Sequence, residues 1–322
     1  MLPLFEDLDG GNPGGFDRKG LSRRLAHLAE QQIYLGTSSW KYDGWLDQIY
    51  TRERYTTRGK FSQKRFEQEC LNEYAEVFPI VCGDFSFYQF PSDAYWSRLF
   101  ASAPRNLRFA FKVPEDVTVK TFPTHPRYGA KAGIDNEVFL NAEIFKAGFA
   151  NPLMQYRRQV SALIFEFGTF HRRSMPDVDA FLDCLDPFLT QLPKEFRYAV
   201  EIRNPEYLGD DYFGVLRRHN VAHVFNAWTR MPEIQTQTSL HNAFTADFTL
   251  VRALLRHGRP YEEAVAKFSP YATIQDENPQ TRQALKGLIQ RAKAKKEPSF
   301  IFVNNRLEGN APSTIEAIVQ ED

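Results

Sequence analysis

Six charged residues fall at or just beyond the ends of short apolar runs, where folding could gather them around one hollow. Side chains at the carboxyl ends of parallel strands become neighbours, because those ends meet at one edge of a sheet or one mouth of a barrel. Carboxylates that share such a site can act as acid, base or nucleophile, as in glycoside hydrolysis, and cations stabilise developing negative charge. The acids are Asp84, Glu166 and Glu201, and the bases are Lys112, Arg203 and Arg252.

We assign catalytic roles to four of these residues. Glu201 is the candidate base or nucleophile, with Glu166 or Asp84 as its partner, because neighbouring cations keep carboxylates ionised. Lys112 would stabilise charge; a Schiff-base role is the weaker alternative, because nearby acids keep an amine protonated. A structural ion-pair network, in which Glu201 neutralises Arg203, would use the same residues. Purely structural barrel interiors are filled with branched apolar side chains, which favours a ligand site.

Polar and aromatic side chains near the same run ends are candidates for binding a substrate. Asparagine amides can orient hydroxyl groups, and aromatic rings offer faces on which a sugar ring stacks. Of the adjacent pair Asn304 and Asn305, alternation along a strand turns one inward, and the pattern does not decide which. The candidate binding residues are Ser38, Trp40, Ser86, Tyr88, Arg203, Asn226, Trp228, Arg252, Asn304, Asn305 and Arg306.

The segment GNAPST, Gly309–Thr314, is typical of a helix start, with Pro312 in the first turn. Backbone N–H groups at a helix N-terminus favour phosphate or carboxylate, and TIM barrels often bind phosphate after the last strands. Arg252 and Arg306 could clamp such an anion. Ordinary capping without a ligand explains the segment equally well. The expected partner is a small molecule, which could be anionic.

No cofactor motif occurs in the chain. There is no Walker-type loop, no GxGxxG and no Ser/His/Asp order, and the seven histidines are scattered. We therefore predict no cofactor and assign no metal ligands. A divalent ion held by Asp84, Glu166 and Glu201 stays open, although the adjacent cations would compete with it.

Eight short apolar runs, separated by lengths that suit a helix, must position these residues. Turn-forming or polar residues bound each run, as expected of buried parallel strands joined by crossovers. Eight such units predict an α/β fold, the (β/α)₈ TIM-type barrel, with its site at the mouth formed by the strand ends. The runs are Ile33–Trp40, Ile80–Tyr88, Leu107–Pro114, Ala162–Gly168, Tyr198–Pro205, Val221–Trp228, Asp247–Ala253 and Phe300–Arg306.

The apolar positions of each strand show which of its side chains point toward the helices, because side chains alternate between the two faces of a sheet. Phe109, Phe111 and Val113 suit the helix-facing side, which turns Lys112 toward the barrel axis. The same alternation turns the following residues inward: Gly36, Ser38, Trp40, Cys82, Asp84, Ser86, Tyr88, Glu166, Glu201, Arg203, Asn226, Trp228 and Arg252.

We predict a flexible, Gly- and Pro-rich extension at residues 1–20 and one barrel domain at residues 21–322. An amphipathic helix is expected at Leu21–Gln32, before the first strand. Two long loops that follow strands, Lys41–Lys60 and Glu115–Asp135, are candidate lids. Further helices are expected at Ser62–Phe78, Val138–Phe149, Pro176–Gln191, Tyr212–His219, Pro260–Phe268, Pro279–Lys296 and Pro312–Val319.

The composition limits the classes of partner. The 40 basic and 40 acidic side chains of this 322-residue chain cancel, which removes any overall attraction to nucleic acid or anionic membranes. Three cysteines without metal-ligand spacing fit a reduced, cytoplasmic setting. No apolar run of about 20 residues and no signal-peptide pattern occurs, so a membrane partner is not expected.

Two alternatives to an enzyme stay open. Thr51–Arg65 interleaves six Lys and Arg with Tyr55 and Phe61, and Arg291–Lys296 adds a basic run, a pattern that nucleic-acid-binding surfaces show. Neighbouring acids such as Glu67 make an ordinary solvated surface the favoured interpretation. A barrel that binds a metabolite or a protein without turnover is the other alternative. The oligomeric state is not specified.

Five ordered segments resemble the signature segments of the YecE-like family, the TIM-barrel group called domain of unknown function 72. The resemblance runs from Ile33 to the C-terminus and implies the barrel fold and the same register. Many relatives have Asn, Gln and His where this chain has Asp84, Glu166 and Arg306. The resemblance implies no particular reaction. The segments are IYLGTSSWKYDGW, CGDFSFYQFPS, FAFKVP, YAVEIRNPEYL and FVNNRLEGNAP.

Overall fold

Eight parallel strands close into a barrel, in the order β1-β10-β9-β8-β7-β6-β5-β4, in a computed structural model that describes residues 15–320. The ring closes where Gly36 of β1 pairs with Ile80 of β4. A Cβ at Gly36 would lie 1.9 Å from the carbonyl oxygen of Ile80, so this approach requires glycine. The predicted TIM-type fold is confirmed, and every predicted run overlaps a strand. The strands are β1 (Ile33–Thr37), β4 (Ile80–Gly83), β5 (Arg108–Lys112), β6 (Val160–Glu166), β7 (Tyr198–Glu201), β8 (Ala222–Ala227), β9 (Thr249–Ala253) and β10 (Ser299–Val303).

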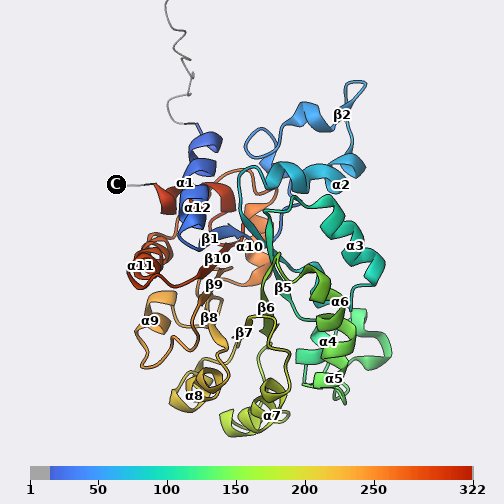
Figure 1. The fold of residues 1–322 in the computed structure, drawn as a ribbon, viewed down its shortest axis with the longest axis vertical. Coiled ribbons are helices and arrows are strands. Elements are labelled where there is room, and N and C mark those ends of the chain that lie inside the picture. The colour runs from blue at the N-terminus through green and yellow to red at the C-terminus, as the bar shows by residue number, and fades with distance from the viewer. Residues whose placement is uncertain (1–14, 321–322) are drawn as a thin grey trace, which may run out of the picture.

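Helices surround the ring, and the N-terminal helix α1 lies beside the C-terminal helix α12 (Figure 1). Helix α1 (Arg18–Glu30) starts three residues before the expected Leu21. Its cap residue Asp17 accepts a hydrogen bond from the Gly20 N–H (2.7 Å) and donates its own N–H to Glu316 of α12 (2.8 Å). The last residues of the predicted extension are therefore tied to the barrel; residues 1–14 lie outside the described part.

Six of the other predicted helices are present, and four places differ. The region Val138–Phe149 forms α5 (Ala142–Phe145), a π-helical turn and α6 (Asn151–Leu153), rather than one regular helix. Helices α3 (Asp93–Ser102) and α9 (Ile234–Ser239) were not predicted, and α4 (Glu115–Thr118) forms in a segment expected to be a loop. In the described part, no helix has the length and apolar character needed to cross a bilayer. The remaining helices are α2 (Gln63–Tyr74), α7 (Val178–Thr190), α8 (Asp210–Arg218), α10 (Tyr261–Phe268), α11 (Pro279–Lys295) and α12 (Ala311–Val319).

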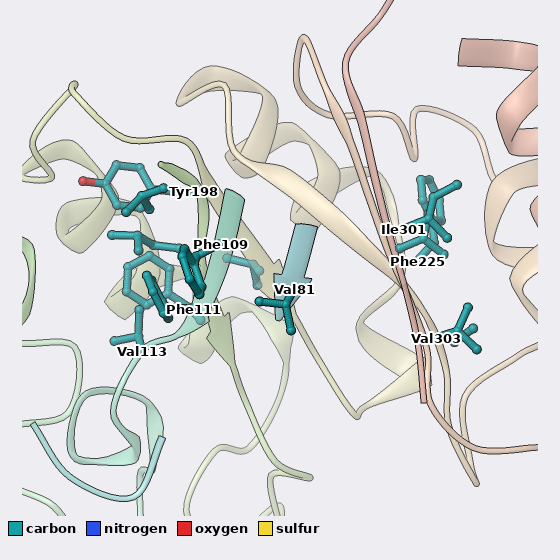
Figure 2. Close-up of a cluster of buried hydrophobic side chains, with 14 of the residues drawn as sticks. Val81, Phe109, Phe111, Val113, Tyr198, Phe225, Ile301 and Val303 are labelled. Atoms are coloured by element: carbon teal, nitrogen blue, oxygen red, sulfur yellow. The ribbon is translucent and has the colours of Figure 1, made fainter. Parts of the chain in front are cut away.

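Two apolar layers hold the barrel, one between strands and helices and one along the axis. Phe109, Phe111 and Val113 belong to the outer layer, as predicted, and Figure 2 shows them on one side of β5. Burying a Phe or Val side chain fully stabilises the fold by about 1.5–3 kcal/mol. The inner layer takes alternate strand residues, which include small ones such as Ala110 of β5 and Ala199 of β7 and large ones such as Phe302 of β10. This apolar layer fills the axis below the charged residues of the mouth.

The loop Lys41–Lys60 packs onto α2. Its Trp45, Tyr50 and Tyr55 are buried, and the rings of Tyr50 and Tyr55 meet Phe66 of α2 at 5.1 and 5.2 Å. A two-stranded hairpin, β2 (Thr56–Thr57) with β3 (Lys60–Phe61), ends the loop. These aromatic contacts hold the middle of the loop on α2. A lid that opens freely would lack such contacts.

Candidate functional site

Arg252 of β9 lies among the three acids at the mouth. Its guanidinium group is 3.2 Å from Asp84 and 2.5 Å from Glu166, and it also contacts Glu201. The Arg252 side chain is only 2% exposed. A buried guanidinium group needs several acceptors, because removing its charge from water is costly. The predicted meeting of these strand ends is thus present, with Arg252 at its centre.

The other two predicted cations complete the cluster. Lys112 Nζ is 3.1 Å from Glu166, and Arg203 Nη2 is 3.2 Å from Glu166 and 2.5 Å from Glu201. Glu166 therefore contacts all three cations. Three acids and three bases leave no formal excess of charge in this group.

The three carboxylates differ in access to solvent. Glu201 is fully buried, whereas the side chains of Glu166 and Asp84 are 15% and 34% exposed. The two oxygens of Glu201 face Arg203 and Arg252, respectively. Glu166 and Asp84 are therefore accessible from the mouth, whereas Glu201, the expected base or nucleophile, is enclosed and contacts the two arginines.

Electrostatics keep this cluster ionised. Burial disfavours the charged form of Glu166, but Lys112, Arg203 and Arg252 outweigh it and hold the pKa of that carboxyl well below its usual range. Burial likewise disfavours charge on Arg252, yet Glu201 and Glu166 raise its pKa well above the usual value. A carboxylate that resists protonation suits a nucleophile or a charge stabiliser better than a general acid.

The alternation predicted beyond β4 stops after Asp84. The strand ends at Gly83 and a 3₁₀ turn follows, so Ser86 turns back and donates to the carbonyl oxygen of Lys112 (2.6 Å). Ser86 is buried and positions Lys112 rather than lining the mouth. Tyr88 is 58% exposed and lies under Arg127, 4.7 Å from its guanidinium carbon. The inward positions predicted for Ser86 and Tyr88 are therefore corrected.

The same turn supplies a ring to the site. The Phe87 ring lies 3.6 Å from Lys112 Nζ, a cation–π contact that fixes the amine beside Glu166. A second stack joins Arg203 to Trp228, with 3.7 Å between the guanidinium carbon and the ring centroid. Arg203 Nε and Nη1 have no hydrogen-bond partner among the described residues. Arg252 Nε is likewise without a partner among these residues, so both arginines keep free donors.

Asn226 reaches the axis as predicted, held by a residue that the sequence did not indicate. Its N–H donates to Gln237 of α9 (3.2 Å), and its side-chain amide donates to the Ile202 carbonyl (3.2 Å). Its Oδ1 is buried without a partner among the described residues. No local pattern marks Gln237, because its contact with Asn226 arises only when α9 packs on β8.

The two asparagines after β10 have separate tasks. Phe300 and Phe302 face the barrel interior, and β10 ends at Val303, before either asparagine. Asn304 accepts from the N–H of Arg306 (3.0 Å). Asn305 accepts from Trp45 Nε1 (3.2 Å) and is buried. Asn305 therefore anchors the first long loop and is a positioning residue.

Trp40 does not extend the site as predicted, whereas no contact among the described residues contradicts the position predicted for Ser38. Trp40 belongs to the outer apolar layer, meets Phe85 edge-on at 5.9 Å and lines a hollow between α2 and α3 together with Tyr95. β1 ends at Thr37, so inward alternation does not reach Trp40, and this placement at the mouth is corrected. The Ser38 hydroxyl is buried without a partner among the described residues.

Arg306 and a residue missed by the sequence lie at the rim. The Arg306 guanidinium carbon is 4.6 Å from the Tyr261 ring. Burial raises the pKa of Tyr42 to about 12, although Arg306 nearby opposes this shift. Tyr42 thus stays a neutral hydrogen-bonding phenol. Its position in a loop of irregular structure gave no periodic signal.

The helix start at Gly309–Thr314 serves capping. Asn310 accepts from the Ser313 N–H (2.8 Å), and Asn305 accepts from the Ala311 N–H (2.8 Å). These backbone N–H groups, which an anion at the helix start would need, therefore already donate to side chains of the protein. The capping interpretation accounts for this segment.

The sequence left open a divalent ion held by Asp84, Glu166 and Glu201. In the structure, the guanidinium group of Arg252 lies among these three carboxylates. Within residues 15–320, no three His, Cys, Asp or Glu side chains are placed to share a metal ion.

Of the two candidate lids, the segment after β5 borders the mouth. Glu115 accepts from Arg127 (2.9 Å) and Tyr128 (2.8 Å), which folds residues 126–131 back over α4.

In the basic loop Thr51–Arg65, Arg54 pairs with Glu76 (3.0 Å) and Arg65 with Glu69 (3.0 Å). These exposed ion pairs support the interpretation of Thr51–Arg65 as an ordinary solvated surface.

Comparisons with known proteins agree with this fold. The model of the family described as "Protein of unknown function DUF72" matches residues 34–321. The chain is 27% identical over 177 residues to the UPF0759 protein YecE of Escherichia coli K12; the match covers 54% of this chain and only about half of that relative, 50%.

Two solved structures share the fold. A DUF72 family protein from Thermotoga maritima has a TM-score of 0.58 at 16% identity, covering 89% of this chain and 96% of that one. One from Enterococcus faecalis has a TM-score of 0.56 at 15% identity, with coverages of 90% and 97%. The family model spans nearly the whole barrel, from β1 through α12. This protein is therefore a member of the DUF72 family.

Proposed function

We propose that this protein is an enzyme that binds a small polar, carbohydrate-like compound at the barrel mouth and uses Glu166 as its reacting carboxylate. The observation that carries the proposal is the partly exposed Glu166 carboxylate in contact with Lys112, Arg203 and Arg252. Permanent ionisation suits attack on, or stabilisation of, an electron-poor carbon. Glu201 would keep Arg203 and Arg252 in place.

The polar groups around Glu166 support a hydroxyl-rich ligand. Asp84 can accept from a hydroxyl group, and Asn226 Oδ1 and Arg203 Nε have unused hydrogen-bonding capacity. Trp228 offers an apolar face beside them. A phosphorylated substrate is the second candidate, favoured by the unpartnered Nε and Nη1 of Arg203.

The test uses the full chain and a panel of glucose, gluconate, ribose 5-phosphate and glucose 6-phosphate, with melting temperature and product formation as readouts. We expect at least one compound to raise the melting temperature and to be converted. Glu166→Gln should abolish conversion, whereas Glu69→Gln, at an exposed pair on α2, should not. Full conversion by the Glu166→Gln variant would overturn the assignment.

A further inference from the structure

A basic cavity lies at the end of the barrel opposite the mouth. Its volume is about 870 Å³, and residues at the entrances of β5, β6, β7 and β8 line it. Arg197 directly precedes β7, and Glu201 ends it, which separates this cavity from the acid cluster by roughly 13 Å along the strand. Its cationic lining residues are Arg108, Arg157, Arg158, Lys194, Arg197 and Arg218.

Most of these cations lack an acidic partner. Arg218 pairs with Asp186 at 2.8 Å. Among the described residues, no carboxylate lies within ion-pair distance of the other five. Arg108 and Arg197 instead lie against aromatic rings, 5.0 Å from Tyr34 and 5.8 Å from Phe248.

The local charge stands out against the whole chain. Two acids, Glu195 and Asp247, line the same cavity, so the five unpaired cations leave an excess of three positive charges. The chain as a whole has none. Like charges gathered without partners repel one another, and a ligand of high negative charge would relieve that repulsion.

We propose that this basic cavity binds a small ligand with adjacent phosphoryl groups, either a free polyphosphate chain or the polyphosphate of a nucleotide. Guanidinium groups match phosphate oxygens in a two-pronged geometry, and Lys194 adds a mobile point charge. The cations come from several strand entrances that converge on one hollow, which suits a compact ligand better than an extended strand of nucleic acid. The site does not depend on the function proposed for the mouth.

The experiment is calorimetric titration of the full chain with tripolyphosphate at low salt. The double variant Arg158→Ala/Lys194→Ala should lose at least about tenfold in affinity, because two charge-assisted contacts are removed. These two residues are exposed and make no contact that the fold needs. Arg23→Ala/Lys64→Ala removes the same charge from exposed positions on α1 and α2 and should bind like the unmodified protein.

The remaining arms separate the sources and the sites. ATP in place of tripolyphosphate should show the same sensitivity to Arg158→Ala/Lys194→Ala if a nucleotide is the source. Glu166→Gln should bind tripolyphosphate unchanged, because it lies at the other end. Equal loss in both double variants, no binding at all, or tighter binding of a single-stranded oligonucleotide than of tripolyphosphate would overturn the proposal.

Discussion

Arg252 Nη1 lies 2.5 Å from Glu166 Oε2, although the two residues are 86 positions apart in the chain and sit on strands β9 and β6. The same nitrogen contacts Glu201 on β7. One guanidinium group therefore bridges two acids from the neighbouring strands β6 and β7 and links them to β9. Glu166 and Glu201 face each other in the strand register, so these two like charges are adjacent and need the cations Arg252 and Arg203 that contact both.

Replacing Arg252 should destabilise the fold strongly. Arg252→Met leaves Glu201 and Glu166 with one fewer buried cation, and breaking a buried pair costs about 3–5 kcal/mol. Urea unfolding at neutral pH would measure this loss in the free energy of unfolding. Arg65→Met, at the exposed pair with Glu69, is the matched control and should cost about 1 kcal/mol or less. Equal losses in the two variants would contradict the central role of Arg252.

Glu166 should make stability depend on acidic pH. Its folded pKa lies below the ordinary value of 4.5, so the stability that the ionised form contributes is complete above pH 4.5 and is lost as the pH falls toward the folded pKa. Down to the folded pKa, each pH unit below 4.5 removes roughly 1 kcal/mol from the free energy of unfolding. The difference in unfolding free energy between the unmodified protein and Glu166→Gln should shrink accordingly between about pH 4.5 and 3.5. A constant difference would refute this.

His223 should act at milder pH. Burial lowers its pKa from 6.5 to about 3, so the folded state excludes a proton that the unfolded chain takes up below pH 6.5. Stability therefore falls as the pH drops below 6.5, by about 2 kcal/mol at pH 5. Denaturant unfolding of His223→Gln should lack this component, whereas His27→Gln, exposed on α1, should keep it. Identical pH profiles for the unmodified protein and His223→Gln would exclude the effect.

Replacing Asn305 should reduce stability more than replacing Asn304. Asn305→Ala leaves the buried Trp45 Nε1 and Ala311 N–H groups without an acceptor, at about 1–3 kcal/mol for each. Asn304→Ala removes the acceptor of the Arg306 N–H alone. Thermal unfolding should show the larger drop in melting temperature for Asn305→Ala. The reverse order would show that Asn304 carries contacts beyond its bond to Arg306.

Strand alternation predicted the site wherever the strand continues to the residue in question. β5 extends to Lys112 and β6 to Glu166, so parity placed both correctly on the axis. β4 stops at Gly83, and the following turn redirects Ser86 and Tyr88. A run of apolar and aromatic letters does not reveal where hydrogen bonding between strands ends.

The sequence alone did not reveal which acid pairs with which base in the cluster. Charge types indicated that acids and bases would meet, but the central place of Arg252 and the enclosure of Glu201 depend on how the strand ends are arranged around the closed ring. Gln237 supports Asn226 from a helix that no periodic pattern announced. Such contacts follow from tertiary packing rather than local preference.

The unpaired cations at the strand entrances give a molecule of zero formal net charge a strongly directional surface potential. Near any polyanionic matrix, such as heparin resin, it should orient with that pole toward the matrix and the mouth toward solvent. Its retention would then respond to ionic strength as that of a basic protein does, despite a sequence pI near neutrality of about 7.1.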